Sequence, residues 1–419
     1  MAHVVTAFLR NRGDLLLVRR SDDVGTYRGR WGGVSGSVEG DPAEALDDAR
    51  REVREAVGVD EAALTLVRGG DPVGVDDEQG ELTVHAFLFD CETRAVSLND
   101  ELDDSEWVPA TAMLRRRTVP RLWDAYRAVS PTAETVEQDR THGSATLSVR
   151  ALEALRDDAA CAESWSEVAE TARALRDARP GMAVLRNRVN RVLSEADRTP
   201  DAVRERAEDA VAAAVEADDR AAAEAAALLD GPTLTLSRSG TVDAALRAAD
   251  VPVFVAESVP GGEGREVAAS LATGADGRDV TLLPDAAVAA VLAERDVAAV
   301  LVGADTVFPD GDVANKTGTR AAAVAAAHES VPVYVAAARD KISGAATHHP
   351  ESAAFDVPDS VEGYAPLFDR TPADLVTVIT EDGELDAADV AATAATHRAL
   401  ATWDDGGDGY HGNDAEPDE

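Results

Sequence analysis

Short apolar runs along residues 231–403 alternate with segments in which apolar residues recur at three- and four-residue spacing. The runs TLTL, VPVFVA, VTLL and VAAVLV are each followed by a polar turn and then by an alanine-rich stretch. Strands that alternate with helices in this way pair in parallel, because each helix returns the chain to the end of the sheet at which the previous strand began. The pattern therefore predicts an α/β domain over 231–403, built on a doubly wound parallel sheet.

Residues 143–230 have a different pattern, which is helical almost throughout. Alanine dominates, and apolar residues again recur at three- and four-residue spacing. Gly181 and Pro200 interrupt the region and no heptad repeat is sustained, which argues against a free coiled coil. We expect a helical bundle that leads into the sheet.

The first 129 residues combine strand and helix patterns. Two apolar runs within 3–20 are joined by NRGD, which is a hairpin signal. A helix is expected over 43–57, ending at Gly58, and another over 112–129. The predicted organisation is an N-terminal domain (1–129), a Pro-, Thr- and Glu-rich linker (130–142), a helical subdomain (143–230), an α/β domain (231–403) and a disordered acidic tail (404–419).

The composition of the 419-residue chain limits its surroundings. Its 40 Lys and Arg oppose 79 Asp and Glu, a net charge of −39. Such a charge is typical of a high-salt organism, where salt screens self-repulsion, and it argues against nucleic acid as a direct partner. Cys91 and Cys161 are far apart, which fits a reducing compartment. Since neither a membrane span nor a signal peptide is evident, we expect a halophilic, cytoplasmic protein with no membrane partner.

Residues 297–320, VAAVLVGADTVFPDGDVANKTGTR, contain the most specific signal. A buried strand is expected to place the Asp305 carboxylate at the carboxyl ends of the parallel strands, where ligands bind in such sheets. The helix expected to follow, 321–327, would offer unpaired backbone N–H groups to an anion, with Lys316 at its start. Lys316 and Lys341 are the two lysines of the chain, and every other basic residue among the 40 is arginine.

Polar residues in the loops after the other predicted strands are expected at the same edge of the sheet. Arginine in such a loop can hold a phosphate bidentately, so the edge is predicted to bind a nucleotide or a sugar phosphate. The predicted ligand- and phosphate-binding residues are Ser237, Arg238, Ser239, Gly240, Arg265, Asn315 and Lys316.

The motifs GAD, GDVANKTGT and VPVYVAA resemble the C-terminal domain of the initiation factor 2B alpha/beta/delta family, which also includes methylthioribose-1-phosphate isomerase and ribose-1,5-bisphosphate isomerase. Arg179-Pro180 matches a signature of the helical subdomain in that family. The resemblance implies a Rossmann-like sheet, a phosphorylated small-molecule ligand and a homo-oligomer formed through this domain. The isomerases pair a cysteine with the aspartate, and Ser237 stands at the cysteine position here. A serine hydroxyl is a far poorer proton carrier near neutral pH.

The N-terminal domain resembles a Nudix domain in its hairpin, in WGGVSG, in REVREAVGV and in SEWVPATAML. The resemblance implies an α/β/α sandwich and, given the haloarchaeal character of the composition, a fusion of haloarchaeal type. It also implies that Glu52 and Glu55, together with Glu39, hold Mg²⁺ against a diphosphate and activate water.

Two departures from the Nudix pattern bear on this metal site. The family has a second glutamate where Ala56 stands, and it places its loop glutamate eight residues before the arginine, whereas Glu39 stands twelve before Arg51. Other carboxylates offer alternative ligands, namely Glu44, Glu78, Glu81 and Glu101. His85 lies in an apolar strand pattern and is expected to be packed rather than to act as a base.

Three functions remain open. The sequence favours a phosphometabolite-binding protein related to initiation factor 2B with a degenerate Nudix domain, because Ala56 and Ser237 each replace a catalytic residue. The second is a Mg²⁺-dependent Nudix hydrolase of a nucleoside diphosphate derivative, in which Glu52 and Glu55 are catalytic. The third is a sugar-phosphate isomerase that uses Asp305.

Overall fold

The computed structural model describes residues 2–23, 25–77, 80–273, 277–347, 349, 351–353, 358 and 360–404. Contacts divide the chain into two compact units, Met1–Thr132 with Arg156–Ala162 and Ala133–Leu155 with Glu163–Glu419. The tail predicted to be disordered lies outside the described residues, apart from Asp404. In the described part, no helix combines the length and the apolar character needed to cross a bilayer.

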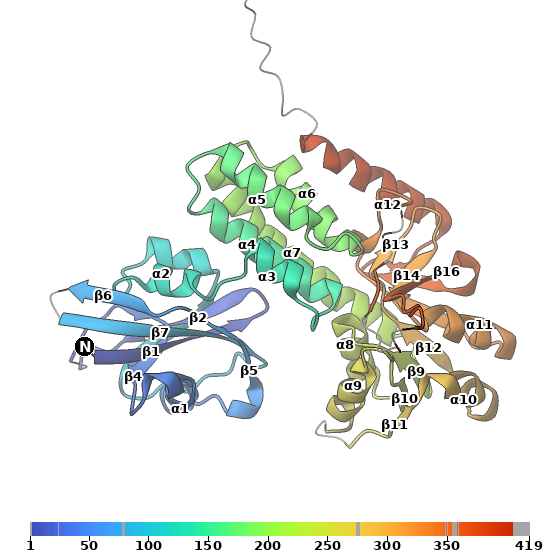
Figure 1. Ribbon diagram of the computed structural model, residues 1–419, viewed down its shortest axis with the longest axis horizontal. Helices are drawn as coiled ribbons and strands as arrows, with labels where there is room; N and C mark the ends of the chain where they lie inside the picture. The colour runs from blue at the N-terminus through green and yellow to red at the C-terminus, as the bar shows by residue number, and fades with distance from the viewer. Residues whose placement is uncertain are drawn as a thin grey trace, which may run out of the picture. The chain divides into compact units, whose positions relative to one another are not determined.

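Eight strands of the described chain form the sheet of the N-terminal unit (Figure 1). The predicted hairpin is confirmed: β1 (Ala2–Asn11) pairs antiparallel with β2 (Asp14–Arg20). Arg12 and Gly13 between them have φ angles of 56° and 85°, which a tight two-residue turn requires. β1 also runs parallel to β7 (Gly80–Cys91). The remaining strands are β3 (Trp31–Gly32), β4 (Val34–Ser37), β5 (Leu64–Gly69), β6 (Val73–Asp77) and β8 (Leu102–Val108).

Helices cover both faces of this sheet, which confirms the α/β/α sandwich (Figure 1). α1 (Ala45–Val57) packs on one face of β1 and β2, and α2 (Leu122–Arg127) packs on the other. The single helix predicted over 112–129 is wrong. The chain instead forms a 3₁₀ helix at Ala110–Arg115, and Thr118 then bridges to Trp31. Pro120 follows at once, and its missing N–H and fixed ring prevent a continuous helix.

The second unit begins with helices. α3 (Ala133–Gln138) lies within the stretch predicted to be a linker, which is therefore partly helical. The predicted helical subdomain contains α4 (Ser144–Ala159), α5 (Trp165–Asp177), α6 (Ala183–Glu195) and α7 (Pro200–Ala226). Pro200 occupies the first turn of α7, where its missing N–H is harmless, and the Thr199 hydroxyl accepts a hydrogen bond from the N–H of Ala202. The residue that interrupts the helical pattern therefore marks the beginning of a helix.

Seven strands of the described residues form the second sheet, in the order β11-β10-β9-β12-β15-β17-β18. Neighbouring strands run parallel except for the last pair, which confirms the doubly wound fold. The strands are β9 (Thr233–Leu236), β10 (Val253–Ala256), β11 (Val280–Leu283), β12 (Ala299–Val302), β15 (Val333–Ala336), β17 (Thr377–Thr380) and β18 (Gly383–Glu384). The strand order reverses between β9 and β12, which is the place where such sheets bind ligands.

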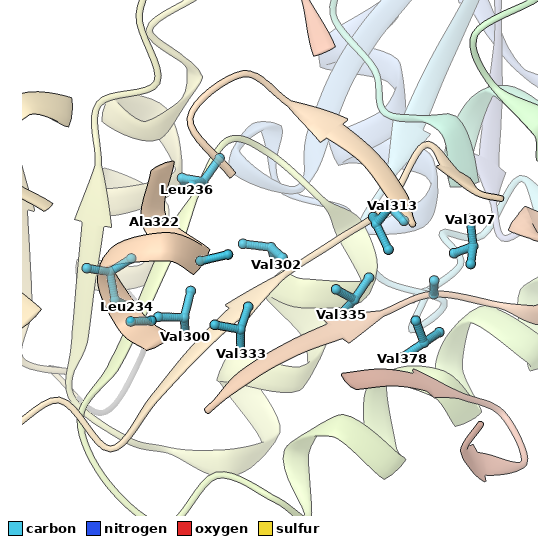
Figure 2. Packing of buried hydrophobic residues seen from close by; sticks show 14 of the residues in the cluster. Leu234, Leu236, Val300, Val302, Val307, Val313, Ala322, Val333, Val335 and Val378 are labelled. Atoms are coloured by element: carbon cyan, nitrogen blue, oxygen red, sulfur yellow. The ribbon is translucent and has the colours of Figure 1, made fainter. Parts of the chain in front are cut away.

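Apolar side chains on both faces of this sheet are buried under helices. On one face, Val300 and Val302 of β12 and Val335 of β15 lie in one cluster with Ala322 of α11 (Thr319–Glu329) (Figure 2). α10 (Val288–Glu294) and α12 (Ala387–Leu400) contribute to the same cluster. On the other face, α7, α8 (Gly240–Ala249) and α9 (Glu263–Ala272) cover the sheet.

A small antiparallel sheet beside the carboxyl end of β12 was not predicted. It contains β13 (Thr306–Val307), β14 (Val313–Lys316) and β16 (Phe368–Thr371). The segment that was expected to be a turn leading into a helix is therefore largely a hairpin, which places Asn315 and Lys316 in a strand.

Candidate functional site

A cavity of about 630 Å³ opens at the point where the strand order reverses. Its wall includes the residues that follow β9 and β12, the end of β14, and residues 140–146. The structure brings together seven of the predicted residues, which are Ser237, Arg238, Ser239, Gly240, Asp305, Asn315 and Lys316. Arg265 does not line this cavity. Its exposed guanidinium binds the Glu257 carboxylate, with Nη2 2.6 Å from Oε1.

Ser237 leaves β9 in a left-handed conformation, with a φ angle of 62°. Its backbone N–H donates a hydrogen bond to the Ser258 hydroxyl at 2.6 Å. Ser258 is held in turn by Asp285, whose Oδ1 accepts from the Ser258 N–H at 2.7 Å. Asp285 therefore shapes the cavity wall from the neighbouring strand end.

Lys316 is buried in the cavity wall, with 5% of its surface exposed. Its Nζ lies 2.7 Å from Oε1 of Glu263, at the start of α9. Oε2 of Glu263 is buried and accepts no hydrogen bond from any described residue, and the same is true of Oε1 of Glu351, which also lines the cavity. Two carboxylate oxygens here can therefore accept hydrogen bonds from a ligand.

Asn315 acts within the protein. Its Nδ2 donates to the Thr319 hydroxyl at 3.0 Å, and that hydroxyl donates to the carbonyl of Lys316 at 2.7 Å. These bonds tie the end of β14 to the first turn of α11 and so fix the direction of the Lys316 side chain.

The start of α11 is occupied by a carboxylate, so it does not offer the unpaired N–H groups that the sequence predicted. Asp369 of β16 accepts hydrogen bonds from the N–H of Gly318 at 2.8 Å and from that of Arg320 at 3.1 Å. Burial raises the pKa of Asp369, while these two N–H groups lower it. Asp369 stands far from α11 in the sequence, and local pattern gave no sign of this cap.

Residues 140–146 and Arg179 form a part of the wall that the loop analysis missed. Asp139 organises this part, since it accepts hydrogen bonds from the N–H groups of Thr141 and His142 and pairs with Arg150 at 2.7 Å. Burial alone would raise the pKa of Asp139, but the hydrogen bonds from His142 and Thr141 outweigh it and hold the pKa well below its usual range. Arg179 donates to the carbonyl of Asp139 at 2.6 Å, which is a structural use of the Arg-Pro signature.

Asp305 and Lys341 both line the cavity. Burial raises the pKa of Asp305, although Lys341, Ser144 and Arg179 oppose the shift. Burial disfavours the charged form of Lys341 as well and so lowers the pKa of its amine. The sequence drew attention to Lys341 only as the second lysine of the chain, and that rarity was the available signal.

Two of the three predicted Nudix metal ligands, Glu39 and Glu52, are paired with Arg51. Nη2 of Arg51 lies 3.1 Å from Oε1 of Glu52, and Nη1 lies 3.5 Å from Oε2 of Glu39 and also contacts Asp48. Burial raises the pKa of Glu52 and Arg51 opposes this. Glu55 is exposed on the helix surface.

Asp48, which the sequence did not single out, also lies beside Arg51. Its buried carboxylate also accepts a hydrogen bond from the Glu39 N–H at 3.0 Å. Ala56 belongs to the apolar core, so the position of the missing glutamate contributes to packing.

Two predicted features of this domain can also be located. Gly36 lies against Glu52, since a Cβ at Gly36 would stand 2.0 Å from the Glu52 carboxylate carbon. Nδ1 of His3 lies 2.9 Å from Nε2 of His85, and burial lowers the pKa of His85.

Of the alternative metal ligands, Glu81 and Glu101 are exposed, and Glu78 lies outside the described residues. Over the described residues, no three His, Cys, Asp or Glu side chains are arranged to hold a metal ion. Magnesium binding stays a prediction.

Two family models match the chain, one described as Initiation factor 2 subunit family over residues 140–387 and one described as NUDIX domain over residues 2–129. A methylthioribose-1-phosphate isomerase from Anaeromyxobacter dehalogenans (strain 2CP-C) is 38% identical over 172 residues, which are 37% of this chain and 50% of the relative. The enzyme of that name from Pseudomonas entomophila (strain L48) is 31% identical over 338 residues, 68% of this chain and 92% of the relative. The chain thus spans about half the length of the first curated relatives and nearly all of others.

Solved structures are similar to the same part of the chain. The translation initiation factor eIF-2B of Pyrococcus horikoshii OT3 is 27% identical with a TM-score of 0.54, over 60% of this chain and 94% of that chain. The 5-methylthioribose 1-phosphate isomerase of the same organism is 23% identical with a TM-score of 0.50, over 64% of this chain and 86% of that chain, and this likeness concerns the fold alone.

Proposed function

Because the chain belongs to the Initiation factor 2 subunit family and has an N-terminal NUDIX domain, we propose that its C-terminal cavity isomerises a phosphorylated sugar between aldose and ketose forms. The observation that carries the proposal is Asp305, a carboxyl group in the cavity wall whose pKa is raised by burial. The methylthioribose-1-phosphate isomerases that match nearly their full length support the same reaction class. This ranks the isomerase above the binding protein that the sequence favoured.

Isomerisation requires a group that gives a proton to an oxygen of the substrate and takes one back. A carboxyl with a raised pKa holds its proton at higher pH and can donate it to the ring oxygen as the sugar ring opens, after which the carboxylate accepts the proton of the C2 hydroxyl. Asp305 is suited to both steps.

The polar groups around Asp305 suit a phosphorylated, hydroxyl-rich ligand. Lys316 and Arg238 place positive charge in the wall, and a phosphate can bind to either. Sugar hydroxyls can donate to the unpaired oxygens of Glu263 and Glu351.

The test is conversion of methylthioribose 1-phosphate or ribose 1,5-bisphosphate to a ketose, measured in buffers up to molar KCl. Asp305→Asn should reduce kcat by about 10²- to 10⁴-fold, the usual contribution of an acid–base group. Arg265→Ala is the matched control and should be close to wild type, since Arg265 lies outside the cavity. An active Asp305→Asn protein, or an inactive wild type on both sugars, would overturn the proposal.

A regulatory phosphometabolite-binding protein is the second candidate. The observation in its favour is Ser237 at the cavity, while both cysteines of the chain, Cys91 and Cys161, lie in the other unit. Tight ligand binding without turnover, lost in Lys316→Ala, would favour it over the isomerase.

The Mg²⁺-dependent hydrolase is the third candidate. Its predicted ligands do not fit a metal site as they stand, because Glu39 and Glu52 are bound to Arg51. Homo-oligomers formed through the C-terminal domain and a cytoplasmic location stay predictions, and light scattering during gel filtration tests the first of them.

A further inference from the structure

Both lysines of this lysine-poor chain line the same cavity. All other basic residues among the 40 are arginine, yet Lys316 and Lys341 are buried in one wall, with exposures of 5% and 2%. Arginine supplies a fixed positive charge equally well, but it does not lose its proton in proteins, whereas a buried lysine does. Two lysines at one site therefore point to chemistry that needs an amine.

The two lysines have different surroundings. Lys316 is held at 2.7 Å by Glu263, so it serves as a fixed cation. Lys341 ends a 3₁₀ helix, Arg339–Lys341, that follows β15. The carboxylate of its neighbour Asp340 is already bound by Arg191 at 2.7 Å and by Arg188 at 3.2 Å.

We propose that Lys341 is a catalytic proton carrier that works with Asp305 in the sugar-phosphate isomerisation. The proposal rests on the proposed function. Its geometric basis is that Lys341 and Asp305 line one cavity, in whose wall Lys341 is 2% exposed.

The charged groups around Lys341 come from three further elements. Asp218 on α7 and Asp305 after β12 favour its charged form, whereas Arg188 on α6 disfavours it. Burial is the largest influence and lowers the pKa of Lys341, just as burial raises the pKa of Asp305. The pair can exist as charged Lys341 with ionised Asp305, or as neutral Lys341 with protonated Asp305. The two pKa shifts bring these states closer in free energy. The neutral state contains a base, the amine, and an acid, the carboxyl.

The steps balance without any further reactant. In a furanose 1-phosphate O1 carries the phosphoryl group. The neutral Lys341 amine therefore takes the proton from C2 while Asp305 gives its proton to the ring oxygen O4 and the C1–O4 bond breaks, which leaves an open-chain enol phosphate with a C1=C2 double bond. The Asp305 carboxylate then takes the proton of the O2 hydroxyl, and the Lys341 ammonium gives its proton to C1. The product is the ketose, and both side chains return to their starting states.

The experiment compares Lys341→Arg and Lys341→Met with wild type for kcat, its pH dependence, exchange of the C2 hydrogen with D₂O, and ligand affinity. Both variants should lose at least about 100-fold in kcat and in exchange, while ligand affinity changes only a few-fold. In wild type, kcat should rise with pH as the amine deprotonates and fall as Asp305 ionises. In Lys341→Met, the loss of a nearby positive charge should move the falling limb to higher pH.

Lys341→Arg keeps the charge next to Asp218 and Asp305, so it is the variant expected to fold. Retention of wild-type kcat and pH dependence in Lys341→Arg would overturn the role of Lys341 and leave the isomerase intact. A wild type with neither turnover nor exchange would overturn both.

A direct measurement needs no substrate. With ¹⁵N-lysine labelling the chain has two side-chain amine signals, and assignment by Lys316→Met leaves that of Lys341. Titration of this signal below the ordinary range of lysine supports the proposal, and titration in the ordinary range overturns it.

Discussion

The two predicted sites of this protein differ in how their charges are satisfied. In the N-terminal unit, Arg51 contacts Glu39, Asp48 and Glu52, so two of the three predicted metal ligands already have a cation. In the cavity of the second unit, Glu263 and Glu351 each keep a buried oxygen without a partner among the described residues. Unpaired buried polar groups cost free energy that a ligand can recover. The comparison indicates that the cavity is built for a ligand and that the Nudix helix is built for internal stability.

The largest effect on stability should come from breaking the ion pair of the cavity. Glu263→Ala leaves the ammonium of Lys316 buried and unpaired, so we expect a loss of roughly 3 kcal/mol of unfolding free energy. Chemical denaturation measures it. Glu266→Ala is the control, because its pair with Arg238 is exposed and should contribute less than about 1 kcal/mol. Equal losses in the two variants would contradict the account of a buried pair.

Removal of Arg51 should leave carboxylate oxygens of the N-terminal unit without a cation, as in the cavity of the second unit. Arg51→Met leaves three carboxylates near one another, so we expect a loss of about 2 kcal/mol from the missing charged hydrogen bonds. Mg²⁺ should then raise the melting temperature of the variant more than that of wild type, since the freed oxygens can bind a hard cation.

Arg50→Met is the matched control for Arg51. Arg50 lies on the same helix and pairs with Asp47 of that helix at 3.7 Å and with Glu61, beyond its end, at 3.4 Å. Its melting temperature should show the wild-type response to Mg²⁺. If Arg51→Met also responds like wild type, the arginine does not stand in for a metal ion.

A smaller loss of unfolding free energy is expected at Asp369, whose carboxylate accepts hydrogen bonds from the N–H groups at the start of α11. Asp369→Ala removes the cap of α11 and should cost about 1 kcal/mol, because the N–H groups of Gly318 and Arg320 lose their acceptor. Asp310→Ala is the control, since it removes a partly exposed ion pair with Arg370 and one long hydrogen bond from the Asp312 N–H, and caps no helix. A phosphate ion that restores the stability of Asp369→Ala would indicate that the helix start can still bind an anion.

The sequence predicted the two large sheets and most helices, because apolar periodicity and turn residues are local signals, but it missed the small sheet of β13, β14 and β16. It also predicted that Ser237, Asp305 and Lys316 converge, because parallel strands end at one edge. It missed the cap by Asp369 and the wall at 140–146, since both depend on contacts between segments far apart in the chain. The role of Arg51 was missed for another reason: spacing along a helix identifies which carboxylates share a face, but it does not say which cation they bind.

The smallest effect concerns the pH dependence of stability. Because burial raises the folded-state pKa of Asp305 above its unfolded value, the folded protein binds the proton more tightly. Stability from this group is present at low pH and is lost as pH rises from the unfolded pKa through the raised one. Asp305→Asn cannot ionise. As pH rises through that window, the unfolding free energy of the variant should therefore increase relative to that of wild type, and above the window the difference between them should stay constant. Asp296→Asn, at an exposed position, should follow wild type throughout. If Asp305→Asn also follows wild type at every pH, the carboxyl is not the proton-holding group that the cavity requires.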